Sequence, residues 1–171
     1  MWEAIKRLSV RGAPAIGVAA AYGLYLGMAR RNIEHIEEFK KVYKEISDYL
    51  ATSRPTAVNL FWALKSCQKS QDELGDSVSV SKRLEVLLET AKDIHRDDQD
   101  RCQKIAEHGS KLLDQKTKGI LTHCNAGALA TAGVGTAVGV ITEFARRNTI
   151  TVYVDETRPL LQGSRLTAWE M

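Results

Sequence analysis

Cysteine is scarce in this sequence of 171 residues, and its three copies argue against a disulfide-built protein. Cys67, Cys102 and Cys124 cannot all pair with one another, and none of them stands in a C-x-x-C pattern. A small secreted domain held by disulfides is therefore disfavoured, and we expect a reduced protein of the cytoplasm. The sequence also opens without a signal-peptide pattern, which agrees with that expectation.

The sequence also has few prolines, a small net charge and no long apolar run. With 3 prolines and 44% hydrophobic residues, the sequence predicts a folded chain with a buried core, not a disordered one. Its formal net charge is +3, with 24 basic residues interspersed among 21 acidic ones, so we expect no nucleic-acid partner. The longest apolar run, from Pro14 to Met28, is short and interrupted by glycine. It predicts a buried helix and no contact with a membrane.

Helical patterns fill the first two thirds of the sequence. Pro14 fits the first turn of a helix, where its missing N–H costs nothing. A second break surrounds Pro55, and a polar loop precedes the longest helical tract. We expect five helices, over residues 2–8, 14–31, 32–52, 57–69 and 79–113.

The pattern changes at Gly119, where strands begin to alternate with helices. We expect strands over residues 120–122 and 149–154, and helices over 128–147 and 163–171. This order predicts a right-handed crossover and a parallel sheet. The fold class is therefore α/β, with a helical N-terminal domain over 1–116 and the first part of a Rossmann-like domain over 117–171. Two parallel strands do not form a stable sheet alone, so we expect a fragment that lacks the rest of that domain.

Polar side chains follow both predicted strands. His123, Cys124 and Asn125 come after the first strand, and the run Asp155 to Arg158 follows the second. Ligands of open parallel sheets bind at the carboxyl ends of the strands, so we expect a site there. The residues alone leave two interpretations of Cys124 open, a catalytic thiol or a small buried hydrophobic side chain.

Small residues follow Asn125 and are expected to let a helix N-terminus approach a ligand. Gly133 and Gly135 fall inside the predicted helix at a spacing that does not fit a dinucleotide-binding turn, so we interpret them as packing residues.

Two arginines stand in breaks that precede helices. Arg11 lies beside Gly12 before the second helix, and Arg54 lies before the fourth. A guanidinium next to a helix N-terminus suits a phosphate, because it adds a permanent charge to the positive end of the helix dipole. Each arginine alone is also consistent with a surface ion pair, but together they favour a phosphorylated small molecule as ligand.

Four motifs at these positions resemble the methylthioribose-1-phosphate isomerases. They are VRGAPAIG at 10–17, SRPTAVNL at 53–60, ILTHCNAGALATAG at 120–133 and VYVDETRPLLQGSRLTAWE at 152–170. These methionine-salvage enzymes are related to the regulatory subunits of a guanine-nucleotide exchange factor of eukaryotic translation initiation. The resemblance implies an aldose–ketose isomerase that converts 5-methylthioribose 1-phosphate into 5-methylthioribulose 1-phosphate. It also implies a homodimer at full length, with no metal and no nucleotide cofactor.

The resemblance further implies roles for six residues. Cys124 is the catalytic cysteine, Arg11, Gly12 and Ala13 match a substrate-binding Arg-Gly-Ala, and Arg54 and Gln162 match two other substrate contacts. The family's partner aspartate follows the WE of LTAWE at some distance, and Asp155 belongs to a different motif. We therefore expect this sequence to be a fragment, without that aspartate and without a segment before the first helix, and to be inactive alone.

Two alternatives to this substrate and activity stay open. One is an isomerase of a related pentose phosphate, either 5-deoxyribose 1-phosphate or ribose 1,5-bisphosphate. The Ala-Pro pair of VRGAPAIG argues against the bisphosphate, because that group of isomerases usually lacks the pair. The other alternative is a non-enzymatic regulatory subunit on the same fold. Retention of the Arg-Gly-Ala and His-Cys-Asn signatures argues against it.

Overall fold

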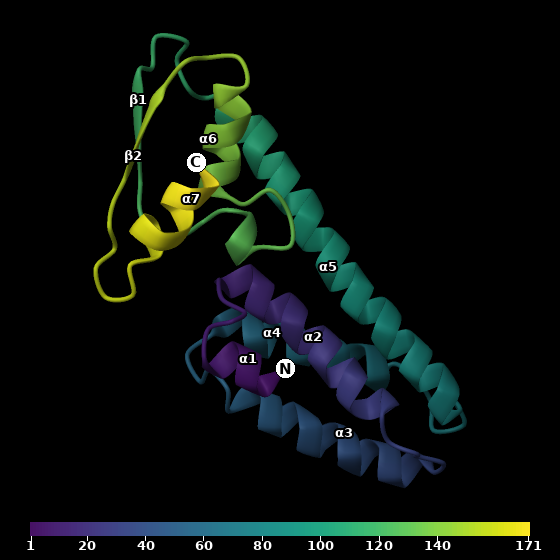
Figure 1. Cartoon of the computed structure of the whole chain (residues 1–171). Helices are drawn as coiled ribbons and strands as arrows, with labels where there is room; N and C mark the ends of the chain where they lie inside the picture. Colours follow the sequence, from purple (N-terminus) through teal and green to yellow (C-terminus); the bar gives the residue numbers. More distant parts are fainter. The chain divides into compact units, whose positions relative to one another are not determined.

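The computed structural model describes residues 1–171 and divides the chain into two compact units, Met1–His95 and Arg96–Met171. Helix α5 (Val80–Ser110) contributes to both units. The first unit is helical and the second contains a parallel two-stranded sheet, which confirms the α/β class (Figure 1). The domain boundary after residue 116 stays a prediction.

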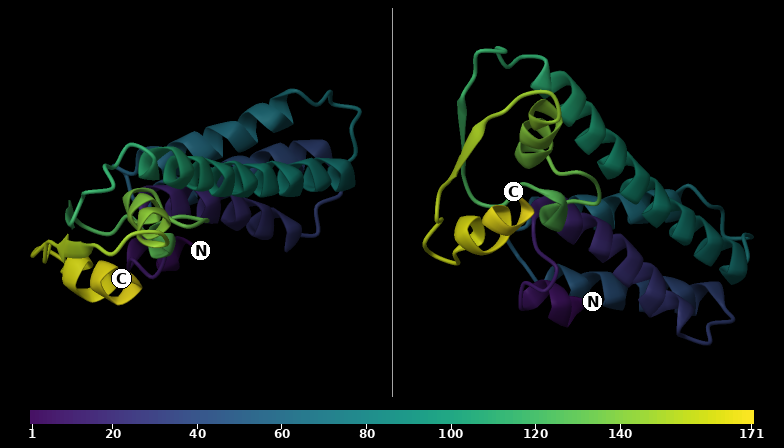
Figure 2. Two further views of the ribbon diagram at one scale, coloured as in Figure 1. Left: turned by 90° about the horizontal axis from the view of Figure 1, so that it is seen from above. Right: turned by 45° about the horizontal axis from the view of Figure 1, so that its top comes forward.

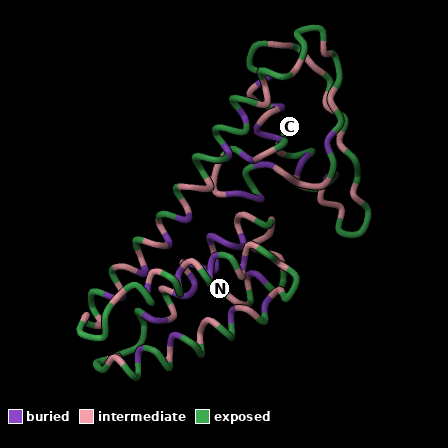
Figure 3. Tube along the Cα trace, turned by 180° about the vertical axis from the view of Figure 1, so that it is seen from behind, coloured by how far each residue is buried: buried purple, intermediate pink, exposed green.

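The first unit is built around α2 (Ala13–Ala29), the most apolar of its helices. Because α2 carries apolar or small residues nearly all round, it lies inside the unit and packs against α3 (Ile36–Ala51) and α4 (Val58–Asp72) (Figure 1). Helix α3 buries one stripe only, and its exposed side follows the outside of the unit in Figure 3. The short α1 (Trp2–Lys6) also contacts α2.

Glycines of α2 allow its neighbours to approach closely, as its Ala- and Gly-rich sequence predicts. A Cβ atom on Gly17 would lie 3.0 Å from the carbonyl oxygen of Asn59, near the start of α4. A Cβ on Gly27 would lie equally close, 3.0 Å, to the side chain of Ile46 on α3. Larger residues at these two positions would therefore push the neighbouring helices away.

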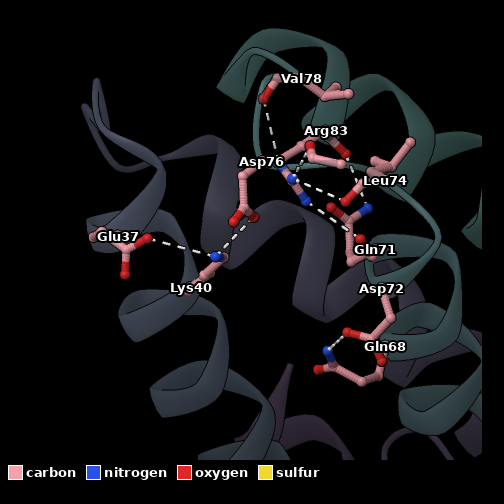
Figure 4. A network of polar contacts seen from close by, with 10 residues as sticks. Glu37, Lys40, Gln68, Gln71, Asp72, Leu74, Asp76, Val78 and Arg83 are labelled. Atoms are coloured by element: carbon pink, nitrogen blue, oxygen red, sulfur yellow. Dashed lines mark hydrogen bonds and ion pairs between the residues drawn. The ribbon is translucent and has the colours of Figure 1, made fainter.

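The polar loop between α4 and α5 is organised by Arg83, which is buried (Figure 4). Its Nη2 donates hydrogen bonds to the carbonyl oxygens of Gly75 at 2.7 Å and Leu74 at 3.3 Å. Its Nη1 donates to the carbonyl oxygen of Gln71 at 3.3 Å, and the Gln71 side chain donates back to the Arg83 carbonyl. One guanidinium thus bonds three carbonyl groups of the last turn of α4 and the loop that follows it.

The second unit contains strands β1 (Gly119–Thr122) and β2 (Thr151–Val154). They pair in parallel, with Gly119 opposite Thr151 and Thr122 opposite Val154. Helix α6 (Ala137–Ala145) connects them and packs against the second half of α5, where a Cβ on Gly139 would lie 3.5 Å from that of Ala106. Figure 1 shows the two strands side by side, and Figure 2 shows the same unit from two further sides.

The helix predicted over 128–147 is wrong in its first half. A short 3-10 turn, η1 (Ala128–Ala130), is followed by irregular chain, and α6 begins only at Ala137. Gly133 and Gly135 therefore lie before the helix and not inside it. Gly135 has a left-handed φ of +90°, and the Asp98 carboxylate accepts the backbone N–H of Ala132 at 2.7 Å. These two features set a non-helical path for the chain before α6.

The same correction applies to the expected helix N-terminus directly after Asn125, which the structure does not form. The packing role of Gly133 does hold, because a Cβ there would lie 3.0 Å from the Cβ of Cys102. At the C-terminal end, the expected helix is a π-helical turn, η2 (Gly163–Thr167), that continues into α7 (Ala168–Glu170). None of the helices combines the length and apolar character needed to cross a membrane.

Candidate active site

The carboxyl ends of β1 and β2 meet, as the sequence predicts. Thr122 is paired with Val154 at the end of the sheet, so the two polar segments leave it side by side. The His123 ring contacts the Asp155 carboxylate through Nδ1 at 3.0 Å. The backbone N–H of Cys124 donates to Oγ1 of Thr157 at 2.9 Å. The predicted strand-end residues are therefore in direct contact.

Cys124 is held in an unusual backbone conformation. Its φ is +63°, a left-handed value that costs a non-glycine residue about 1–3 kcal/mol. The buried hydroxyl of Thr167 donates to the Cys124 carbonyl at 2.6 Å, while Thr157 accepts its N–H. Both backbone polar groups of Cys124 are thus bonded to threonine side chains. These two contacts hold the strained backbone conformation of Cys124.

The other cysteines occupy different surroundings. All three thiols are free, but Cys67 and Cys102 are buried whereas Cys124 is half-buried. Burial raises the pKa of Cys67 to about 12, and burial is also the main reason why the pKa of Cys102 is raised. Cys124 is therefore the accessible thiol of the chain.

Glu170 joins Asn125 in the strand-end cluster, and the sequence did not indicate a site role for Glu170. The Asn125 amide nitrogen donates to the Glu170 carboxylate and, at 3.1 Å, to Oγ1 of Thr167. The other carboxylate oxygen of Glu170 accepts the backbone N–H of Leu129 at 2.9 Å. Glu170 and Thr167 both stand in the LTAWE motif that carried the resemblance. They are three positions apart, a spacing that places two side chains on one face of a helix, and this spacing could have indicated that they act together.

Gln162 belongs to the same unit as Cys124. The preceding Leu161 donates its backbone N–H to the Thr157 carbonyl at 2.8 Å, which folds this segment back onto the strand-end cluster. Gln162 presents a buried side-chain oxygen, Oε1, that has no hydrogen-bond partner. The next residue, Gly163, leaves no room for a side chain, because a Cβ there would overlap the carbonyl oxygen of Asp155.

The predicted phosphate-binding residues all lie in the first unit. Gly12 has φ of +83° and caps α2, Ala13 begins that helix, and Pro14 stands in its first turn. Arg11 has a buried Nε without a partner. Arg54 lies before α4, and the close approach of Gly17 to Asn59 places the starts of α2 and α4 next to each other. Arg11 and Arg54 therefore precede two helices whose N-terminal parts approach each other within one unit.

A further hollow of the first unit is lined by none of the residues predicted from the sequence. This hollow of about 620 Å³ is lined by α3, α4 and the loop around Arg83. Its walls include Phe39, Tyr43, Gln71 and Asp72. No group of three or more His, Cys, Asp or Glu side chains is arranged to hold a metal ion.

Comparison with known proteins identifies the family of the chain. The model of the Initiation factor 2 subunit family matches residues 9–171. The chain belongs to this family. Within it, the chain is 54% identical to a methylthioribose-1-phosphate isomerase of Caldicellulosiruptor saccharolyticus and 49% identical to a 5-deoxyribose 1-phosphate isomerase of Petrotoga mobilis. Each match covers 100% of this chain and 49% of the relative, so the chain spans about half the length of these relatives.

Two solved structures of the Initiation factor 2 subunit family have the same fold. The 5-methylthioribose 1-phosphate isomerase of Pyrococcus horikoshii is 38% identical with a TM-score of 0.89, over 99% of this chain and 47% of the other. The translation initiation factor eIF-2B, subunit delta, of A. fulgidus is 42% identical with a TM-score of 0.85, over 99% of this chain and 49% of the other. The family thus includes relatives with isomerase names and one with a translation-factor name.

Proposed function

We propose that the protein is an isomerase of a sugar 1-phosphate, with 5-methylthioribose 1-phosphate as substrate and 5-methylthioribulose 1-phosphate as product. The observation that carries this proposal is the half-buried Cys124 thiol, which two threonine hydroxyls hold in a strained conformation at the strand ends. Enzymes store strain of this kind at reacting groups. The isomerase names of relatives about half identical to the chain support the same assignment.

The reaction moves hydrogen within one molecule and needs no external redox partner. One hydrogen passes from C2 to C1, the bond between C1 and the ring oxygen breaks, and C2 becomes a carbonyl. The proton of the C2 hydroxyl ends on the former ring oxygen, so atoms and electrons balance. In the proposed site, the Cys124 thiol faces C1 and C2. It either transfers protons between these carbons or, in a hydride shift, stays protonated and shields them from water.

The remaining site residues bind the substrate in this proposal. Arg11 and Arg54, with the backbone N–H groups of Gly12 and Ala13, hold the phosphate, because guanidinium groups and helix N-termini both favour anions. The unpartnered Oε1 of Gln162 accepts a hydrogen bond from the sugar. Asp155 does not serve as the second reacting group, since its carboxylate contacts His123 at 3.0 Å. We propose that a carboxylate outside these 171 residues has that role and that the protein acts as a homodimer.

A turnover assay tests the proposal. The full gene product is expected to isomerise 5-methylthioribose 1-phosphate, and the 171-residue chain alone is expected to show no turnover. A panel with 5-deoxyribose 1-phosphate and ribose 1,5-bisphosphate in parallel identifies the substrate by the highest kcat/KM. Failure of the full gene product to convert any of the three sugar phosphates would refute the isomerase assignment.

A substrate without the methylthio group is the first alternative. Relatives named 5-deoxyribose 1-phosphate isomerase are 49% and 50% identical to the chain, close to the 54% of a methylthioribose-1-phosphate isomerase. The second alternative is a regulatory subunit, which the 42% identical translation-factor structure supports. Capture of a translation-initiation complex by the protein, without binding of any sugar phosphate, would establish it.

A further inference from the structure

We propose that Asn125 is a further substrate-binding residue, whose side-chain oxygen accepts a hydrogen bond from a hydroxyl of the sugar, and that Glu170 is the positioning residue that sets its orientation. The inference rests on the proposed function and adds one contact, together with its support, to the site around Cys124.

The orientation of the Asn125 amide follows from its neighbours. An ionised carboxylate can only accept hydrogen bonds, so the amide atom that faces Glu170 must be the nitrogen. The second proton of that nitrogen points to Oγ1 of Thr167 at 3.1 Å. The Thr167 hydroxyl donates its own proton to the Cys124 carbonyl at 2.6 Å, so it is free to accept from Asn125. Both amide protons therefore have fixed partners, and the oxygen points away from them.

The amide oxygen that remains has no partner in the chain. Oδ1 of Asn125 is buried and accepts no hydrogen bond. Buried polar groups in folded proteins are nearly always bonded, so this oxygen calls for a donor from outside the chain. A sugar hydroxyl is such a donor, whereas an ionised phosphate is not. Since Asn125 directly follows Cys124, a sugar that lies against the thiol is one residue away from this acceptor.

Glu170 is itself fixed, which makes it a positioning residue and not a flexible neighbour. Its second carboxylate oxygen accepts the Leu129 N–H at 2.9 Å. Its carboxylate fills the space beside Gly127, where a Cβ would overlap it. A flip of the Asn125 amide would turn Oδ1 toward this carboxylate and place two acceptors against each other. Glu170 thus holds the amide oxygen toward the ligand side.

The contact is tested by the response of Asn125 variants to the sugar hydroxyls. Inhibition constants of the 2-deoxy and 3-deoxy substrate analogues are measured in the full gene product, for the wild type and for Asn125→Ala. In the wild type, loss of the contacted hydroxyl is expected to weaken binding about tenfold relative to the parent sugar. In Asn125→Ala that difference is expected to shrink to about twofold or less. An unchanged difference for both analogues in Asn125→Ala overturns the inference.

A pair of isosteric changes tests the positioning role. Glu170→Gln lets the Asn125 amide flip and is expected to raise KM about tenfold. The double variant Glu170→Gln with Asn125→Asp reverses the polarity of the bond, because the introduced glutamine amide then donates to the introduced aspartate. The Thr167 hydroxyl must turn its proton from the Cys124 carbonyl to the same aspartate oxygen, which leaves the other oxygen for the sugar. The double variant is expected to recover discrimination between the two analogues. Glu85→Gln, an exposed change at a carboxylate paired with Lys82 on α5, is the matched control and should leave KM unchanged.

The outcomes separate this inference from the proposed function. A double variant that folds like the wild type but discriminates no better than Glu170→Gln overturns the positioning role of Glu170. A wild-type protein that turns over the sugar while Asn125→Ala keeps its full discrimination overturns the Asn125 contact and leaves the isomerase assignment intact. A wild-type protein that turns over no sugar phosphate removes the proposed function, and this inference with it.

Discussion

Single residues in this chain differ in how completely their polar atoms are bonded. Cys124 has both backbone groups bonded by threonine hydroxyls, so its strained conformation is firmly supported. Tyr43 is the opposite case, because its buried hydroxyl has no hydrogen-bond partner. Burial, with smaller contributions from Cys67 and Asp72, raises the pKa of Tyr43 well above its ordinary value. The first residue belongs to the proposed chemistry, and the second lowers the stability of the fold.

Cys124→Ser tests the proposed chemistry with a minimal change of size. The variant is expected to lower kcat of the full gene product by about 10²-fold or more, because a hydroxyl replaces the thiol beside the reacting carbons. Substrate affinity is expected to change by less than about threefold, since the variant leaves the proposed phosphate contacts of Arg11 and Arg54 unchanged. Steady-state kinetics with a direct binding measurement checks both numbers. Near-normal turnover would remove Cys124 from the mechanism.

Tyr43→Phe is expected to stabilise the chain by about 1 kcal/mol, because it removes a buried hydroxyl without a partner and keeps the ring stacked on Phe39. The gain should grow at alkaline pH. An exposed tyrosine in the unfolded chain ionises above about pH 10, whereas the folded hydroxyl stays protonated, so the wild-type chain loses stability as pH rises above about 10 and Tyr43→Phe does not. Urea unfolding at about pH 7 and about pH 10.5 measures both effects, and a destabilised variant contradicts them.

At the scale of helices and strands, the hydrophobic pattern of the sequence was sufficient to predict some elements but not others. The apolar character of the Pro14–Met28 run predicted that α2 is buried, because a helix with apolar residues all round lies inside a unit. The helix expected over 128–147 failed at its start, where Gly133 and Gly135 oppose the helix that the alanines favour. There the Asp98 carboxylate and the left-handed Gly135 decide the path of the chain. Neither contact is visible in the local sequence.

The importance of close packing around η2 is tested by replacing one glycine there and another glycine in an open loop. Gly163→Ala is expected to cost about 3 kcal/mol, because the new Cβ would overlap the Asp155 carbonyl and force the segment that carries Gln162 away from the strand ends. Gly75→Ala is the control, since the nearest atom to its added Cβ is the Ser77 hydroxyl at 4.0 Å. Thermal unfolding of the two variants compares them. Equal melting temperatures would show that η2 can move without cost.

The molecule as a whole leaves one face of its small sheet uncovered. Leu121 and Tyr153 are paired across β1 and β2, and they are 66% and 59% exposed. Two strands with free edges and an apolar face favour association with other sheets. The 171-residue chain is therefore expected to self-associate through this face.

Leu121→Lys is expected to reduce that association, because it places a charge on the exposed face and leaves the core unchanged. The free energy of unfolding should change by less than about 0.5 kcal/mol. Leu112→Lys is the control, since Leu112 is 87% exposed but lies outside the sheet. Light scattering after size-exclusion chromatography, over a range of chain concentrations, measures the effect. Equal association of both variants would exclude the sheet face.

The sequence by itself determined the helical first unit, the parallel strand pair and the meeting of polar residues at the strand ends. These features follow from hydrophobic periodicity and from chain order, which are local or topological properties. Only the tertiary structure decided how Cys124 is held and which way the Asn125 amide points. Thr157, Thr167 and Glu170 lie 33 to 45 positions further along the chain than the residues they bind. No local pattern encodes contacts over such separations, because they arise only once β1, β2 and η2 have packed together.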